Sequence, residues 1–175
     1  MPTLESSERL RDRTHKAAVA SWIAEELQRG DHRFVSCTLT LKQALPRDDG
    51  TLASTSKQDA ERAMNGFLTR LDRAVYKNAA WRFGKKLARC GVVEGGAGTG
   101  KRLHLHVLIE HPDFIGFDAF EAVIRSTWQQ CPLSMEQVEV QPVVSGTVGQ
   151  IVRYITKTGT DAICVGNMEL ARRAR

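Results

Sequence analysis

The sequence predicts an α+β fold built on one antiparallel sheet of four or five strands. Segments in which apolar and polar residues alternate, as in a strand with one buried face, are interleaved with segments whose apolar residues recur every three or four positions, as in an amphipathic helix. Two of the strand segments follow each other directly, with only a short glycine-rich linker between them. Such a linker favours a hairpin and therefore antiparallel pairing.

The first half of the chain contains two predicted helices and one predicted strand. Residues 5–30 carry a moderate apolar stripe and predict an N-terminal helix. Residues 33–42, RFVSCTLTLK, alternate so regularly that one face of the strand is apolar and the other is rich in hydroxyl groups. Residues 54–79 predict the second helix, and Ser56 with Asp59 three residues later resembles a capping box at its start.

The second half of the chain contains three predicted strands and two predicted helices. Residues 87–94 and 102–110 predict two strands, and residues 117–131 predict a helix with an aromatic stripe. A strand at 136–144 and a short helix at 147–159 follow. The order helix, β-α-β-β-α-β, helix contains the ferredoxin-like split β-α-β pattern, which implies a sheet with helices on one face and an open second face.

Length, composition and charge are those of one intracellular domain with additional terminal segments. The chain has 175 residues, 42% of them hydrophobic and 26% charged, and it lacks a run of about 18 apolar residues that could span a membrane. We divide it into a helical arm (1–30), a domain (31–160) and a basic tail (161–175). The N-terminus has no apolar signal segment, so we expect a cytoplasmic protein without a membrane partner. The net charge of +5 suits a polyanion such as DNA or RNA.

Residues 95–101, GGAGTGK, have the spacing of a phosphate-binding P-loop. A P-loop requires a helix that starts at its lysine and a Ser or Thr directly after that lysine. Here Arg102 follows Lys101, and the next residues alternate like a strand. We therefore interpret the segment as a hairpin linker with two solvated cations, and we expect no nucleotide cofactor.

A histidine pair lies in the strand that follows this linker. His104 and His106 are two residues apart, so both side chains project from one face of the strand and can chelate one cation. Glu94, on the strand before the linker, is the candidate third ligand. Because Val92 shares the parity of Glu94, we expect a bulge or a turn at the strand end to aim the carboxylate. The alternative interpretation is a pair of surface histidines without a ligand.

The last predicted helix contains a tyrosine and a lysine three residues apart. Tyr154 and Lys157 lie on one flank of this helix with Gln150. A phenolate can attack a phosphodiester, a metal ion can polarise the scissile phosphate, and an ammonium group can ease the build-up of negative charge. The alternative interpretation is a solvated helix flank.

The three segments, taken in order, resemble the motifs of HUH rolling-circle replication initiators. The strand VSCTLTLK is followed by a His-hydrophobic-His strand, LHLHVLI, and then by a helix with a Y-x-x-K motif, YITK. The resemblance covers about residues 33–158 and includes the order of the elements. Single-tyrosine HUH transposases share this order, whereas conjugative relaxases usually place the tyrosine ahead of the histidines. We therefore rank a replication initiator first and a transposase second.

The resemblance implies a metal-dependent endonuclease and ligase that acts on single-stranded DNA or an origin hairpin. His104, His106 and Glu94 would hold Mg²⁺ or Mn²⁺ on the open face of the sheet. Tyr154, assisted by Lys157, would nick the strand, become linked to its 5′-phosphate and leave a free 3′-OH. DNA contacts are expected from Thr38, Thr40, Lys42, Lys101, Arg102, Gln150 and Arg153.

A non-catalytic alternative is an RNA-binding or single-stranded-DNA-binding module of the same fold. Such modules stack bases on aromatic side chains of the open sheet face. The strand faces predicted here present Thr, His and Lys instead, which favours the enzyme.

Overall fold

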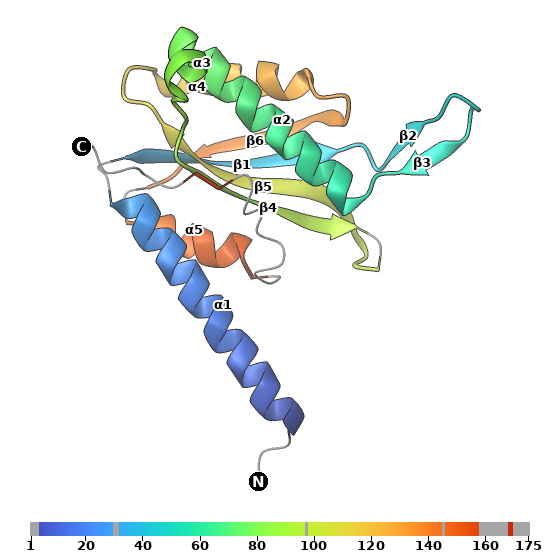
Figure 1. Ribbon diagram of the computed structural model, residues 1–175, viewed down its shortest axis with the longest axis vertical. Helices are drawn as coiled ribbons and strands as arrows, with labels where there is room; N and C mark the ends of the chain where they lie inside the picture. Colours follow the sequence, from blue (N-terminus) through green and yellow to red (C-terminus); the bar gives the residue numbers. More distant parts are fainter. Residues whose placement is uncertain (1–3, 30–31, 97, 145, 158–167, 170–175) are drawn as a thin grey trace.

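The computed structural model describes residues 4–29, 32–96, 98–144, 146–157 and 168–169. It contains a four-stranded antiparallel sheet with helices packed on both faces, and a separate two-stranded ribbon (Figure 1). The predicted α+β class and the antiparallel sheet are therefore confirmed. In chain order the elements are α1 (Leu4–Gln28), β1 (Arg33–Leu41), β2 (Ala44–Pro46), β3 (Leu52–Ser54), α2 (Lys57–Tyr76), α3 (Asn78–Phe83), β4 (Arg89–Gly96), β5 (Lys101–His111), α4 (Phe117–Gln129), β6 (Ser134–Pro142) and α5 (Val148–Ile155).

The strand order of the sheet is β4-β5-β1-β6, and all neighbouring strands are antiparallel. The central strands β1 and β5 are the first and third strands of the β-α-β-β-α-β unit, as in a ferredoxin-like sheet. β6 forms one edge and ends at Pro142, which has no N–H to donate to a further strand. The sheet order brings the two segments with the strongest alternation, β1 and β5, side by side.

The alternation of β1 decides which residues face the helices α2 and α4. Its residues Val35, Cys37 and Leu39 are fully buried and join one core with the apolar stripes of these helices. Phe67 of α2 and Trp128 of α4 meet edge to face in this core, with ring centres 5.6 Å apart. This layer supports the sheet from the side opposite to the histidine pair.

The predicted helix 54–79 is two helices in the structure. The Ser56 hydroxyl accepts a hydrogen bond from the Asp59 main-chain N–H, and the Asp59 carboxylate accepts one from the Ser56 N–H, so the capping box is confirmed. Lys77 has a φ of +51°, which a right-handed helix cannot contain, and α3 starts after it.

The second face of the sheet is partly covered, although the ferredoxin-like pattern predicted it to be open. α1 and α5 pack against each other and against this face (Figure 1). Ile23 of α1 and Val152 of α5 are fully buried there, together with Val92 and Leu108 of the sheet. β4 and β5 carry apolar residues on both faces over this part of their length, so they need a second layer. The prediction of helices on one face is therefore right for α2 and α4 and wrong for α1 and α5.

Two further segments depart from the predicted pattern. The connector after β1 forms the ribbon β2–β3, which projects from the body of the protein (Figure 1). At its tip, the Asp49 carboxylate accepts hydrogen bonds from the N–H and the hydroxyl of Thr51.

Of the predicted basic tail, Met168 and Glu169 alone lie within the described residues. Among the helices described, none combines the length and the apolar character that a membrane span requires.

A buried ion pair connects α2 to the start of β4. Nη1 of Arg89 lies 2.7 Å from both carboxylate oxygens of Asp72, and both side chains are almost completely buried. Oδ1 of Asp72 also accepts a hydrogen bond from the Leu87 N–H at 3.0 Å. These contacts fix the position of an edge strand relative to the helix that covers it.

Candidate metal centre and tyrosine site

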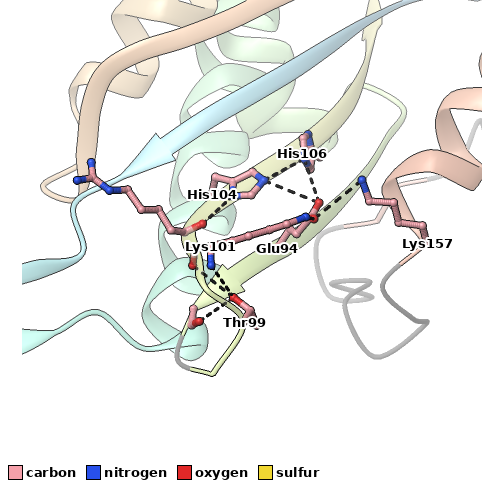
Figure 2. Close-up of polar contacts among 8 residues, drawn as sticks. Glu94, Thr99, Lys101, His104, His106 and Lys157 are labelled. Atoms are coloured by element: carbon pink, nitrogen blue, oxygen red, sulfur yellow. Dashed lines mark hydrogen bonds and ion pairs between the residues drawn. The ribbon is translucent and has the colours of Figure 1, made fainter.

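The three predicted metal ligands meet at one end of the β4–β5 hairpin (Figure 2). Glu94 stands directly opposite His104 in the register, and His106 follows on the same face of β5. The Nε2 atoms of the histidines are 3.1 Å apart, and Oε2 of Glu94 lies 3.2 Å from that of His106 and 3.8 Å from that of His104. One ligand atom from each residue lies within 4.8 Å of the others, so the cluster can hold a metal ion.

The Nδ1 atoms of both histidines are engaged outside the cluster. Nδ1 of His104 lies 2.8 Å from the main-chain oxygen of Arg102, and because a carbonyl only accepts, this Nδ1 carries the proton. Nδ1 of His106 lies 3.3 Å from the hydroxyl of Thr38 on β1. Each imidazole therefore presents Nε2 to Glu94, and partners of this kind orient metal-binding histidines in proteins.

The electrostatics of the cluster favour the forms that bind a cation. A hydrogen bond from Lys101 holds the pKa of Glu94 below its ordinary value despite burial, and the positive charge of Lys157 lowers it further. Burial is the main cause that lowers the pKa of His106, and the neighbouring His104 lowers this pKa further. At neutral pH Glu94 is thus a carboxylate and His106 a neutral imidazole, which are the forms that act as ligands.

Glu94 points at the histidines through ordinary strand alternation, so the expectation of a bulge that aims it is wrong. Val92 does share its face, but it is buried in the core beneath α1 and α5. The register shift comes after Glu94, where Gly95 and Gly96 have φ values of +90° and +104°. A Cβ on Gly95 would collide with the main-chain oxygen of Arg102, so only glycine fits at this point.

The helix α5 and the turn that follows it bring Tyr154 and Lys157 to the same site. The rings of Tyr154 and His106 meet edge to face, with centres 5.9 Å apart. Nζ of Lys157 lies 3.7 Å from the centre of the Tyr154 ring and 4.0 Å from Oε1 of Glu94. Tyr154 is 56% exposed, so a substrate can reach its hydroxyl. The apolar side of the helix packs in the second core and holds the tyrosine in place.

Lys101, predicted both as a solvated linker residue and as a DNA contact, lies at this site and has a 58% exposed side chain. It starts a strand, which confirms a hairpin in place of the helix that a P-loop requires. Its Nζ atom lies 2.8 Å from Oε1 of Glu94 (Figure 2). This hydrogen bond and the negative charge of Glu94 raise the pKa of Lys101 above its ordinary value. Oε1 of Glu94 is thus held by ammonium groups, and Oε2 faces the histidines.

A groove of about 500 Å³ lies beside the tyrosine on the histidine side of the sheet. Thr38 and Gln150, two of the predicted DNA contacts, line it together with Ser36. Glu139 and Gln141 of β6 also line the groove, and sequence reasoning missed them. They stand opposite Thr38 and Ser36 in the β1–β6 register, a pairing that only the order of the strands reveals.

The other predicted DNA contacts are distributed more widely. Thr40 stands opposite His104, one of the candidate metal ligands, in the β1–β5 register. Lys42 lies beyond the end of β1 and donates a hydrogen bond to the carbonyl oxygen of Pro132 at 3.0 Å, so it is not brought to the groove. Arg102 and Arg153 are exposed, and the former contributes its main-chain oxygen to the histidine pair.

The chain matches no protein-family model, no curated protein and no solved structure. No function can therefore be inferred from a relative, and the chemistry of the site is inferred from the residues of the chain. Three of those residues, Glu94, His104 and His106, form a cluster that can hold a metal ion, and it lies beside an exposed tyrosine.

Proposed function

We propose that this protein is a metal-dependent enzyme that nicks and rejoins single-stranded DNA through a covalent tyrosine–DNA intermediate. The observation that carries the proposal is the meeting of Tyr154 with the cluster of Glu94, His104 and His106. The tyrosine comes from the last helix and the ligands come from a hairpin much earlier in the chain. A nucleophile beside a cation site is what attack on a phosphodiester requires.

The cluster suits Mn²⁺ or Mg²⁺ with the remaining coordination positions left to substrate and water. Two imidazole nitrogens and one carboxylate supply only part of the ligands that such ions take. The nitrogen ligands favour Mn²⁺, because Mg²⁺ prefers oxygen. When bound, the ion would supply Lewis-acid polarisation of the scissile phosphate.

The side chains of the protein perform the other steps. Oη of Tyr154 attacks the phosphorus, the P–Oη bond forms and the P–O3′ bond breaks. The phenol proton passes through solvent to the departing 3′-oxygen, so the products are a 5′-phosphotyrosine and a free 3′-OH. Lys157 stabilises negative charge on the phenolate and on the phosphate. Attack by a 3′-OH reverses the reaction, and rejoining needs no nucleotide because the phosphotyrosine link conserves the energy of the broken bond.

The groove beside Tyr154 is the proposed path of the DNA strand next to the cleaved bond. Its hydroxyl and amide groups, among them those of Thr38 and Gln150, can bond phosphates and bases. Replication initiation is the role we favour over transposition, because Lys157, the lysine of the Y-x-x-K motif, contacts the tyrosine ring.

The proposal is tested by detecting the covalent adduct. Single-stranded oligonucleotides with a random central segment and a label at the 3′ end are incubated with the protein and Mn²⁺, and the products are separated on a denaturing gel. Labelled DNA should migrate with the protein, and EDTA should abolish this band. Because the chain contains only two tyrosines, Tyr76→Phe is the matched control for Tyr154→Phe.

The control variant removes one hydroxyl and keeps the aromatic ring, so it should form the adduct at the wild-type level, and Tyr154→Phe should form none. An adduct of the same size with Tyr154→Phe would show that another residue is the nucleophile. If the wild-type protein forms no adduct from the random pool, the nicking activity itself is contradicted.

A further inference from the structure

The net positive charge of the protein is concentrated in one segment. The whole chain has 25 Lys and Arg against 20 Asp and Glu. Residues 73–86, RAVYKNAAWRFGKK, contain five of these cations and no acid, so the remaining 20 cations and 20 acids balance. The segment spans the end of α2, the whole of α3 and the start of the connection to β4.

The same region exposes aromatic rings. Trp81 is 77% exposed and Phe83 is 81% exposed, and neither is part of the two hydrophobic cores. Phe114, in the loop after β5, is 66% exposed, and its ring centre lies 6.1 Å from that of Tyr76. Several large rings left in water in one region are typical of a binding surface.

Cations and rings contact one another across this region. Arg73 lies over the Trp81 ring at 5.5 Å from its centre, and Nζ of Lys85 lies 4.5 Å from the centre of the Tyr76 ring. Arg73 and Tyr76 are three residues apart on α2, so they join these contacts into one patch. We call Arg73, Tyr76, Trp81, Lys85 and Phe114 the aromatic–basic surface.

We propose that the aromatic–basic surface binds single-stranded DNA, as a second contact outside the nicking site. Lys86 pairs with Glu169 at 3.1 Å, and the other four cations of the segment are exposed. Exposed cations attract phosphates, and exposed rings provide faces on which unstacked bases pack. A duplex offers phosphates but keeps its bases stacked inside, so it cannot use the rings. The choice of DNA over RNA rests on the proposed nicking function, whereas the binding of a nucleic-acid strand by rings and cations does not.

The aromatic–basic surface and the metal centre lie on different sides of the sheet. α2 packs on the face opposite to the histidines, and α3 continues from it (Figure 1). From its first residue, β4 runs about 16 Å along the sheet before it reaches Glu94, at about 3.3 Å per residue. A DNA strand that contacts both the aromatic–basic surface and the metal centre must therefore pass around the edge of the sheet. The surface therefore holds DNA that flanks the cleavage point and adds affinity without touching the cleaved bond.

The experiment measures binding without cleavage, in Tyr154→Phe protein with EDTA. The probe is a fluorescein-labelled oligo(dT) of about 30 nucleotides, followed by fluorescence anisotropy at low salt. In this background Trp81→Ala should weaken binding by about tenfold or more, as expected for the loss of one stacked base. Trp22→Ala is the matched control, because Trp22 is a half-exposed tryptophan on α1, and it should change the affinity by less than about twofold.

A second variant separates charge from stacking. Arg82 is the exposed cation next to Trp81 on α3. Arg82→Ala combined with Lys85→Ala should reduce the magnitude of the negative slope of log affinity against log salt by about 0.7 for each phosphate that the protein no longer neutralises. A duplex of the same length should bind more weakly than oligo(dT), and Trp81→Ala should leave that duplex binding unchanged.

An unchanged affinity for oligo(dT) in Trp81→Ala would overturn the proposal, and so would an equal loss in Trp22→Ala. Tighter binding of oligo(rU) than of oligo(dT) would overturn the assignment to DNA. Because the measurement requires neither the tyrosine nucleophile nor a metal ion, its failure is distinct from a failure of the nicking activity.

Discussion

Nζ of Lys157 lies 3.7 Å from the centre of the Tyr154 ring, at the turn that ends α5. The same ammonium group lies 4.0 Å from Oε1 of Glu94. One cation thus approaches both the proposed nucleophile and a proposed metal ligand. The Lys157 ammonium group therefore couples the electrostatics of the tyrosine to those of the proposed metal cluster.

Lys157→Met should slow adduct formation about 100-fold, because a preorganised charge beside a developing negative charge contributes on this scale. Lys157→Arg keeps the charge and should retain more of the rate. Single-turnover kinetics with the labelled oligonucleotide measure both variants. A wild-type rate in Lys157→Met would mean that the ammonium group takes no part in the chemistry.

The double variant His104→Ala, His106→Ala should lose Mn²⁺ binding and cleavage while DNA binding stays largely intact, because both Nε2 ligands are removed. Isothermal titration calorimetry measures the metal, and the denaturing gel measures cleavage. His15→Ala, at an exposed position of α1, is the control and should bind Mn²⁺ like the wild type. Full cleavage by the double variant would remove the metal centre from the mechanism.

Lys101→Met should tighten Mn²⁺ binding several-fold. The ammonium group lies 2.8 Å from Oε1 of Glu94, where it neutralises the carboxylate and repels a cation held by Oε2. The Lys101 side chain is 58% exposed, so screening by water keeps the effect modest, and added salt should reduce it. Calorimetry at two salt concentrations provides the measurement. A weaker affinity would show instead that Lys101 acts by orienting the carboxylate.

Asp72→Ala should lower the free energy of unfolding by about 3–5 kcal/mol, because it leaves a buried guanidinium without its counter-ion. Nε of Arg89 has no hydrogen-bond partner among the described residues. The loss of Asp72 would therefore leave the guanidinium with still fewer partners. Chemical denaturation followed by circular dichroism measures the change. Asp48→Ala, in the exposed turn of the ribbon, should change stability by less than about 0.5 kcal/mol. Similar small effects of both variants would show that the buried pair contributes little.

Burial raises the pKa of Tyr76 to about 12, and the negative charges of Glu110 and Asp72 add to this effect. In the unfolded chain the phenol ionises near its ordinary pKa of 10.0, so above that pH the unfolded state loses a proton that the folded state keeps. The free energy of unfolding should therefore fall as the pH rises from 10.0 to about 12. In Tyr154→Phe the single remaining tyrosine is Tyr76, and tyrosinate absorbance gives its midpoint. A midpoint near 10.0 in the folded protein would contradict this environment.

The proposed ligands were predictable because strand alternation is a local property. His104 and His106 share a face of β5 whatever the rest of the fold does. Glu94 follows from the hairpin, which places its strand beside theirs. The capping box at Ser56 is equally local, and the structure confirms it.

The remaining features depend on contacts between distant segments. The moderate apolar stripe of α1 does not reveal that the C-terminal part of this helix packs on the sheet, because the apolar residues that it meets belong to other elements. The reach of Lys101 to Glu94 depends on the turn at Gly95. The pairing of Asp72 with Arg89 requires knowledge of how α2 lies on β4. A local stretch of sequence cannot predict such contacts, because the two partners are far apart in the chain.

The helix that carries Tyr154 packs on α1 in the second core, whereas the proposed metal ligands belong to a hairpin of the main sheet. The two elements nevertheless share this core, because Val92 and Leu108 of the hairpin are buried in it together with α1 and α5. A displacement of α1 would therefore disturb the packing beneath both the tyrosine helix and the hairpin. Under the proposed function, a partner that binds the N-terminal helix would thus affect the reaction from outside the site.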